Sequence, residues 1–142
     1  SGFGGGPATK TSATTIGSFI VAASGAEEIT MSEVTITEAS SSSGLSVTRG
    51  YKNLRLTDAS NNRTISRTVA SPIGGAAGNL LGGGPTLKVG QTLTFNVVVD
   101  AIGAPAGDSL QTILSIIKAE GRTSRLSPTI NGLSVTGQIV TF

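Results

Sequence analysis

The chain has 142 residues with neither cysteine nor histidine, and its ten basic and eight acidic side chains give a formal net charge of +2. The missing residue types exclude disulfide bonds, thiol nucleophiles, cysteine-ligated metal centres and histidine acid–base chemistry, so we expect no enzyme. Basic residues are scattered and apolar runs are short, so we expect no nucleic-acid partner and no transmembrane segment. Twenty glycines, 4% aromatic residues and 13% charged residues predict one domain of strands around an aliphatic core.

The beginning of the chain differs in composition from the rest. Residues 1–14 are rich in glycine and small polar residues, and we interpret them as a flexible N-terminal arm. Residues 15–142 form the predicted β-sandwich domain. Its first strand is expected at Thr15–Ala23, which is β-branched and apolar.

A second strand is expected at Ile29–Thr37, where the apolar residues change phase. Met31 lies on one parity and Val34 on the other. This slip predicts either burial on both faces or a β-bulge near Ser32-Glu33.

The clearest hairpin signal lies in the middle of the chain. Tyr51–Thr57 alternates so that Leu54 and Leu56 face inward, Asp58–Asn62 reads as a turn, and Arg63–Ala70 returns along the first strand. Shorter strands are expected at Leu45–Val47 and Thr86–Val89, on either side of an irregular segment at Ser71–Gly84.

Three further strands are expected in the second half of the chain. Thr92–Asp100 alternates in hydrophobicity, and Leu133–Phe142 closes the chain with a bend at Gly137. Leu110–Ala119 fits a helical period as well, but its β-branched isoleucines favour a strand. About eight to ten strands separated by turns predict an all-β fold, an antiparallel Ig-like or jelly-roll-like sandwich in preference to a barrel.

Few residues are candidates for a chemical site. Asp100 and Asp108 bracket a Gly/Pro loop and form a weak candidate calcium site, although Asp108 also suits a turn cap. The triplet Asn62-Arg63-Thr64 makes Asn62 a candidate glycosylation site. No carboxylate pair is marked as catalytic, and we expect no other cofactor.

Six short stretches, which together span most of the chain from Thr15 onward, carry a resemblance: Thr15–Phe19, Ala26–Met31, Tyr51–Leu56, Leu93–Val97, Ala106–Leu110 and Asn131–Val135. They resemble the immunoglobulin-like β-sandwich modules of prokaryotic surface and surface-layer-type proteins. The resemblance implies an extracellular or cell-surface location and a structural or adhesive role without catalytic residues.

A flexible arm followed by an apolar strand suggests β-strand donation between copies. We therefore predict a subunit that self-assembles into a filament or surface array, a homopolymer with these interface residues: Phe3, Ile16, Phe19, Ile20 and Val21. A simpler interpretation is that Thr15–Ala23 is only the first strand of its own domain. The alternative functions are a non-polymerising surface adhesion module and a carbohydrate-binding or virion-decoration module. Glycan binding is weakened by the absence of tryptophan and by the single tyrosine, Tyr51.

Overall fold

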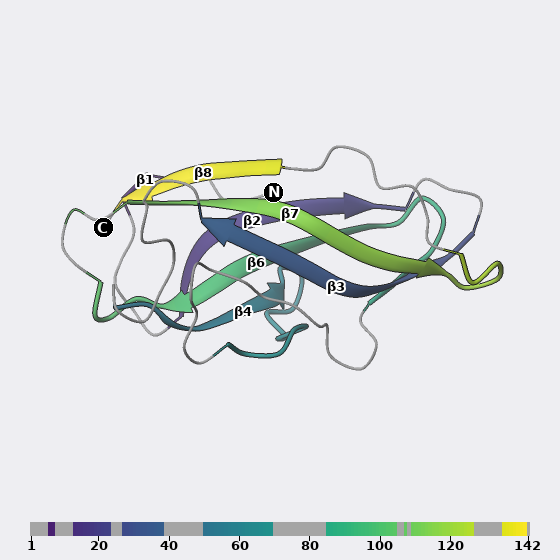
Figure 1. Ribbon diagram of the computed structural model, residues 1–142, viewed down its shortest axis with the longest axis horizontal. Coiled ribbons are helices and arrows are strands. Elements are labelled where there is room, and N and C mark those ends of the chain that lie inside the picture. Colours follow the sequence, from purple (N-terminus) through teal and green to yellow (C-terminus); the bar gives the residue numbers. More distant parts are fainter. Residues whose placement is uncertain are drawn as a thin grey trace.

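The computed structural model describes residues 6–7, 13–23, 27–38, 50–69, 85–104, 107, 109–126 and 135–141. These residues form strands joined by turns, without a helix (Figure 1). The strands are β1 (Gly6–Pro7), β2 (Thr14–Ala22), β3 (Ile29–Glu38), β4 (Lys52–Asp58), β5 (Thr86–Leu87), β6 (Thr92–Asp100), β7 (Ser109–Gly121) and β8 (Val135–Thr141).

Two antiparallel sheets pack face to face, which confirms the predicted β-sandwich (Figure 1). One sheet has the order β1-β8-β7-β3-β5 and the other has the order β2-β6-β4. The two-residue strand β1 is the exception to the antiparallel pattern, because it pairs in parallel with the end of β8. The sandwich is elongated along the direction of the long strands.

The core lies between the sheets and is largely aliphatic, as the composition predicts. β6 confirms its predicted alternation, with Leu93, Phe95, Val97 and Val99 all buried. Phe95 meets Phe19 of β2 at a ring-centroid distance of 5.9 Å. Burial of each large side chain stabilises the fold by about 1.5–3 kcal/mol. The buried residues of β2 and β6 therefore contribute a large part of the core's stability.

The central strand of the larger sheet is β7. It is a strand, as its β-branched residues favour, and it pairs with β3 on one side and β8 on the other. The register of β3 against β7 shifts between Met31 and Glu33, which confirms the predicted bulge, and it shifts again after Thr35. A further irregularity of β8 against β7 falls at 137–138, where a bend was predicted.

The predicted hairpin is present at β4. Leu54 and Leu56 are fully buried, and a turn after Asp58 reverses the chain. The returning segment forms isolated bridges, Leu54↔Val69 and Thr57↔Thr64, in place of a continuous strand. A register shift between Lys52 and Arg55 accompanies this break.

Several expectations fall on residues that the structure does not describe. They are the short strand at Leu45–Val47, the irregular segment at Ser71–Gly84 and most of the N-terminal arm.

Candidate functional site: the strand edges

One side of the sandwich, which we call the open side, is formed by β2 and β8. In Figure 1, β8 runs along the upper margin of the larger sheet, and β2 lies behind it in the smaller sheet. β1 pairs with β8 only opposite Val140 and Thr141. Among the residues that the structure describes, the rest of the outer edge of β8 and the outer edge of β2 have no strand partner. Such edges present backbone N–H and C=O groups that can pair with another chain.

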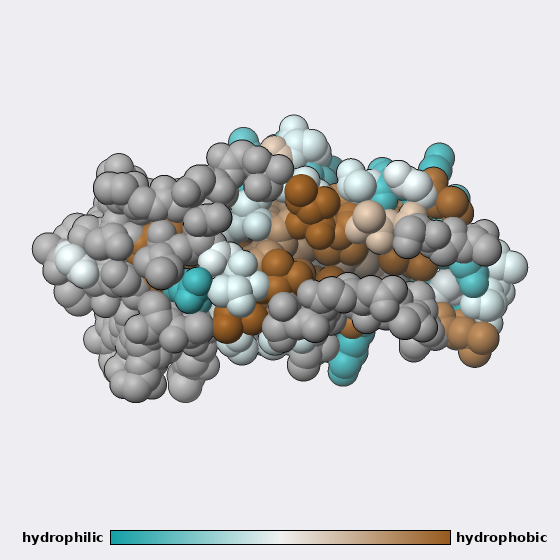
Figure 2. Space-filling view, turned by 90° about the horizontal axis from the view of Figure 1, so that it is seen from above, coloured by the Kyte–Doolittle hydropathy of each residue, from teal (hydrophilic) through white to brown (hydrophobic). Residues whose placement is uncertain are grey.

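Two exposed apolar side chains belong to the strands of the open side, while three others in the described residues, Val89, Ile102 and Leu126, belong to turns between strands. Ile20 of β2 is 53% exposed and Val135 of β8 is 40% exposed. Seen from this side, apolar surface forms a band between the regions drawn in grey (Figure 2). Because isolated apolar residues are common on surfaces, the meaning of this band comes from its position beside two open strand edges.

Glycines bring the sheets close together beneath the open side. A Cβ atom at Gly17 of β2 would overlap the hydroxyl group of Thr112 on β7. A Cβ atom at Gly137 of β8 would lie 3.1 Å from the backbone oxygen and from Oγ1 of Thr112, and 3.4 Å from Cζ of Phe19. The Oγ atoms of Ser18 and Thr112 are buried without a hydrogen-bond partner, which is costly for hydroxyl groups. At this margin the interior is therefore tightly packed, but two of its buried hydroxyl groups lack hydrogen bonds.

The opposite margin of the smaller sheet is covered. The segment 63–69 folds back along β4, where Leu54 and Val69 exchange backbone hydrogen bonds of 2.9 and 2.8 Å. The N–H group of Leu56 donates to Oγ of buried Ser66 at 2.9 Å, and that hydroxyl donates to the Arg67 carbonyl at 3.0 Å. The edge of β4 thus finds its hydrogen-bond partners within the chain.

The far edge of the larger sheet, β3, is covered in part and polar elsewhere. β5 pairs with Ile29 and Thr30, and the Met31 N–H donates to the Pro85 carbonyl at 2.9 Å. Further along β3, Glu33 forms an ion pair with Lys118 of β7 at 3.3 Å. Charged side chains of this kind discourage the pairing of a strand edge with other chains.

A carboxylate fixes the turn at one end of the sandwich. Oε1 of Glu27 accepts hydrogen bonds from the N–H groups of Thr123 and Ser124 at 2.8 and 2.9 Å. The Ser124 hydroxyl, followed by these two N–H groups, lowers the pKa of Glu27 below its ordinary value. Gly121 lies against this carboxylate, and a Cβ atom there would come within 2.7 Å of it. The backbone N–H groups of this turn could bind an anion, but the Glu27 carboxylate of the same chain already accepts their hydrogen bonds.

A surface hollow of about 280 Å³ lies beside the same turn. Its walls are Thr30, Ser32, Glu120, Gly121, Arg122 and Arg125. Arg125 already approaches Glu120 at 3.4 Å, and Arg122 lies 4.0 Å from Glu28. The hollow therefore presents paired surface charges and hydroxyl groups, an arrangement that points to no particular reaction.

The predicted interface residues occupy different environments. Ile16 and Phe19 are buried in the core of this chain, and Val21 packs partly against that core. Ile20 faces solvent on the open side, and Phe3 lies outside the described residues. Ile16 and Phe19 could reach a second copy only if the whole of β2 were exchanged. Their role in an interface stays a prediction.

The other candidate residues have local roles in turns or in the core. Buried Asp100 accepts a hydrogen bond from the Ile102 N–H at 3.1 Å, and Asp108 lies outside the described residues. Within the described part of the chain, no group of three acidic, histidine or cysteine side chains is placed to hold a metal ion. Asn62 is exposed in the turn after β4 with a φ of 58°, which leaves its glycosylation a prediction. Tyr51 is fully buried, so it provides no aromatic surface for a sugar.

Sequence reasoning missed the contacts that join distant segments. The local sequence around Glu27 gives no sign of its contact with Ser124, which lies 97 residues further along the chain. Gly17 and Gly137 both lie in expected strands, but the sequence does not indicate that both approach Thr112. The only sequence signal for such close approach is a glycine inside a strand pattern.

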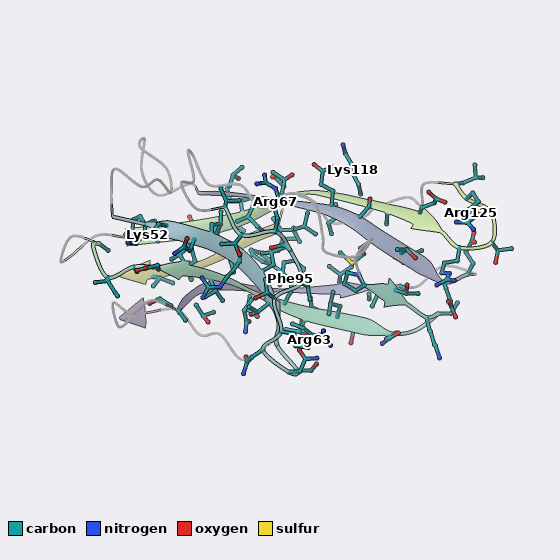
Figure 3. All side chains as sticks on the ribbon, turned by 90° about the horizontal axis from the view of Figure 1, so that it is seen from below. Lys52, Arg63, Arg67, Phe95, Lys118 and Arg125 are labelled. Atoms are coloured by element: carbon teal, nitrogen blue, oxygen red, sulfur yellow. The ribbon has the colours of Figure 1, made fainter. Side chains whose placement is uncertain are left out.

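Among the described residues, the basic side chains labelled in Figure 3 are spread over the sandwich. Lys52 and Arg125 lie toward opposite ends of the sandwich, and Arg63, Arg67 and Lys118 lie apart between them (Figure 3). In the described residues, no helix is long and apolar enough to cross a bilayer.

The described residues therefore define an all-β sandwich in which β2 and β8 form the open side. No protein-family model, no curated protein and no solved structure matches the chain.

Proposed function

We propose that the chain is a structural subunit that assembles with copies of itself through β-strand addition at the open side of the sandwich. The main support for this proposal is the contrast between the strand edges of the sandwich. The outer edge of β4 is hydrogen-bonded by the chain's own return segment, whereas the outer edge of β2 and most of the outer edge of β8 lack a strand partner among the described residues. Strand addition would satisfy those backbone groups and cover the adjacent apolar surface.

The N-terminal segment is the proposed donor. Gly6 and Pro7 of this segment already pair as a strand with β8. A segment passed to a neighbour makes a head-to-tail contact, which gives a filament or array when the rotation between copies does not close. An extracellular or cell-surface location and the absence of catalysis belong to the same proposal. They rest on the composition and on the resemblance to surface modules.

Imaging of the full-length chain tests this proposal. We expect fibres or large ordered arrays by negative-stain electron microscopy, and high-mass species by light scattering. The double substitution Gly4→Pro with Gly5→Pro removes two backbone donors and restricts the donor strand, so it should leave the protein monomeric. The matched control, Gly4→Ala with Gly5→Ala, keeps both N–H groups and should still assemble.

Circular dichroism of each variant shows whether the sandwich stays folded. Folded proline and alanine variants that assemble equally well would contradict the donor role of the N-terminal segment. A wild-type chain that stays monomeric at all concentrations would contradict self-assembly itself.

A further inference from the structure

The parallel pairing of β1 with β8 identifies one edge and one register. We propose that the outer edge of β8 is the acceptor and that its occupant is the segment Ser1–Pro7 of a second copy, in the register Gly6↔Val140 and Pro7↔Thr141. This inference rests on the proposed function and names the site of that assembly. Both open edges offer backbone groups, but β8 is the one on which the N-terminal segment already forms a strand.

The proposed register determines which residues of the donor and of β8 face each other. Carried back from the observed pairs without a slip, it places Ser1 opposite Val135 and Pro7 opposite Thr141. Pro7 falls at the end of the donor strand, where a missing N–H group is best tolerated.

The sizes of the paired residues are complementary along the same register. Phe3, the one large residue of the donor, falls opposite Gly137, the one glycine of β8. The next three donor residues, Gly4–Gly6, fall opposite the bulkier Gln138–Val140. An aromatic residue beside a strand glycine covers backbone that the glycine leaves bare. Gly137 lies next to Phe19 and Thr112, so this position adjoins the core.

A second copy explains the apolar surface that pairing within one chain leaves uncovered. The pairs between Gly6–Pro7 and β8 are the same whether donor and acceptor belong to one chain or to two, as in domain swapping. With the pairing made within one chain, Ile20 and Val135 remain 53% and 40% exposed on the open side. A second copy that packed on this side would cover them and bury further apolar surface. This additional burial favours the exchanged form.

Cysteine cross-linking tests both the edge and the register, because the natural chain has no cysteine. The register pairs Gly2 with exposed Thr136, so equimolar full-length Gly2→Cys and Thr136→Cys proteins are mixed and mildly oxidised. We expect a disulfide-linked dimer, with a yield about tenfold or more above that of Gly2→Cys with Thr68→Cys, an exposed site on the covered margin. Equal yields in the two mixtures would overturn the proposal.

Four further outcomes separate the alternatives. A chain carrying both Gly2→Cys and Thr136→Cys that forms only an intrachain disulfide would overturn exchange between copies. A dimer of Gly2→Cys with Ile20→Cys, formed in place of the Thr136→Cys dimer, would overturn β8 as the acceptor in favour of the β2 edge. Fibres that form without the Thr136 cross-link would overturn this inference and leave the proposed function standing. Absence of both fibres and cross-link would overturn both.

Substitution of Phe3 tests the register independently. Phe3→Ala removes the aromatic residue opposite Gly137, and the protein concentration needed for half-maximal assembly should rise about tenfold or more. Ser1→Ala at the start of the same segment should leave that concentration unchanged. Assembly of Phe3→Ala at the wild-type concentration would overturn the pairing of Phe3 with Gly137.

Discussion

The two outer edges of the smaller sheet differ in whether their backbone N–H and C=O groups are paired within the chain. The β4 margin is covered by its own chain, through hydrogen bonds from Leu54 to Val69 and from Leu56 to Ser66. The β2 margin has no strand partner among the described residues and carries the exposed Ile20. Both edges belong to the same sheet and flank the same strand, β6. The difference makes the open side the candidate for contacts with other molecules.

The largest predicted effect separates the inner and outer faces of β2. Phe19→Ala removes a buried ring that packs on Phe95 and should lower the free energy of unfolding by about 3–5 kcal/mol. Ile20→Ala, at the neighbouring exposed position, should change it by less than about 0.5 kcal/mol. Urea unfolding of the two variants measures both values. Similar losses at the two positions would show that Ile20 is buried in solution, and so would remove the apolar surface of the open side.

The next effect concerns the tight interior beneath the open side. Gly17→Ala places a methyl group against Thr112 Oγ1 and should destabilise the fold by about 1–3 kcal/mol. Thr112→Ala removes a buried hydroxyl without a partner and makes room for that methyl group, so the double variant should recover much of the loss. A double-mutant cycle measured by thermal unfolding checks this coupling. Simple additivity would contradict the close approach of β2 and β7.

The next prediction concerns the margin covered by the return segment, where the expected loss of stability is at most as large as that of Gly17→Ala. Ser66→Ala leaves the buried N–H group of Leu56 without its acceptor and should cost about 1–3 kcal/mol. The nearby exposed Thr68→Ala is the control and should be nearly neutral. Chemical denaturation compares the two. A neutral Ser66→Ala would mean that the return segment does not protect β4, and the contrast between the margins would disappear.

The smallest effect lies at the end of the sandwich and depends on pH. Hydrogen bonds lower the pKa of Glu27 in the folded state, so its contribution to stability is present above its unfolded pKa, near 4.5, and is lost as the pH falls through the folded value. Glu27→Gln should therefore melt at a lower temperature than wild type at pH 7, and this difference should shrink below about pH 4.5. Melting curves from pH 7 to pH 3 measure it, with Glu28→Gln as control. A constant difference at every pH would contradict the carboxylate's role in the turn.

Local pattern predicted the long strands and most of their buried faces, but it did not predict β1, and the return segment after β4 forms isolated bridges where a strand was expected. Alternation along Thr92–Asp100 and the phase change after Met31 correspond directly to β6 and to the bulge in β3. Strand order and the covering of edges could not be predicted, because they depend on contacts between residues far apart in the chain. Glu27 and Ser124 meet across 97 positions, and nothing near either residue specifies the other. The buried position of Phe19 follows from the pattern, but the open edge of β2 follows only from the sheet order.

Hydrogen exchange at β8 tests most directly whether a second copy completes the open side. The account predicts that outward-facing amides between Val135 and Ile139 become protected as the concentration of full-length protein rises, and stay unprotected in the Gly4→Pro with Gly5→Pro variant. Amides of β6, paired on both sides within the chain, should be equally protected throughout. Protection of β8 that does not change with concentration would contradict the account, because it would place the occupant of this edge in the same chain.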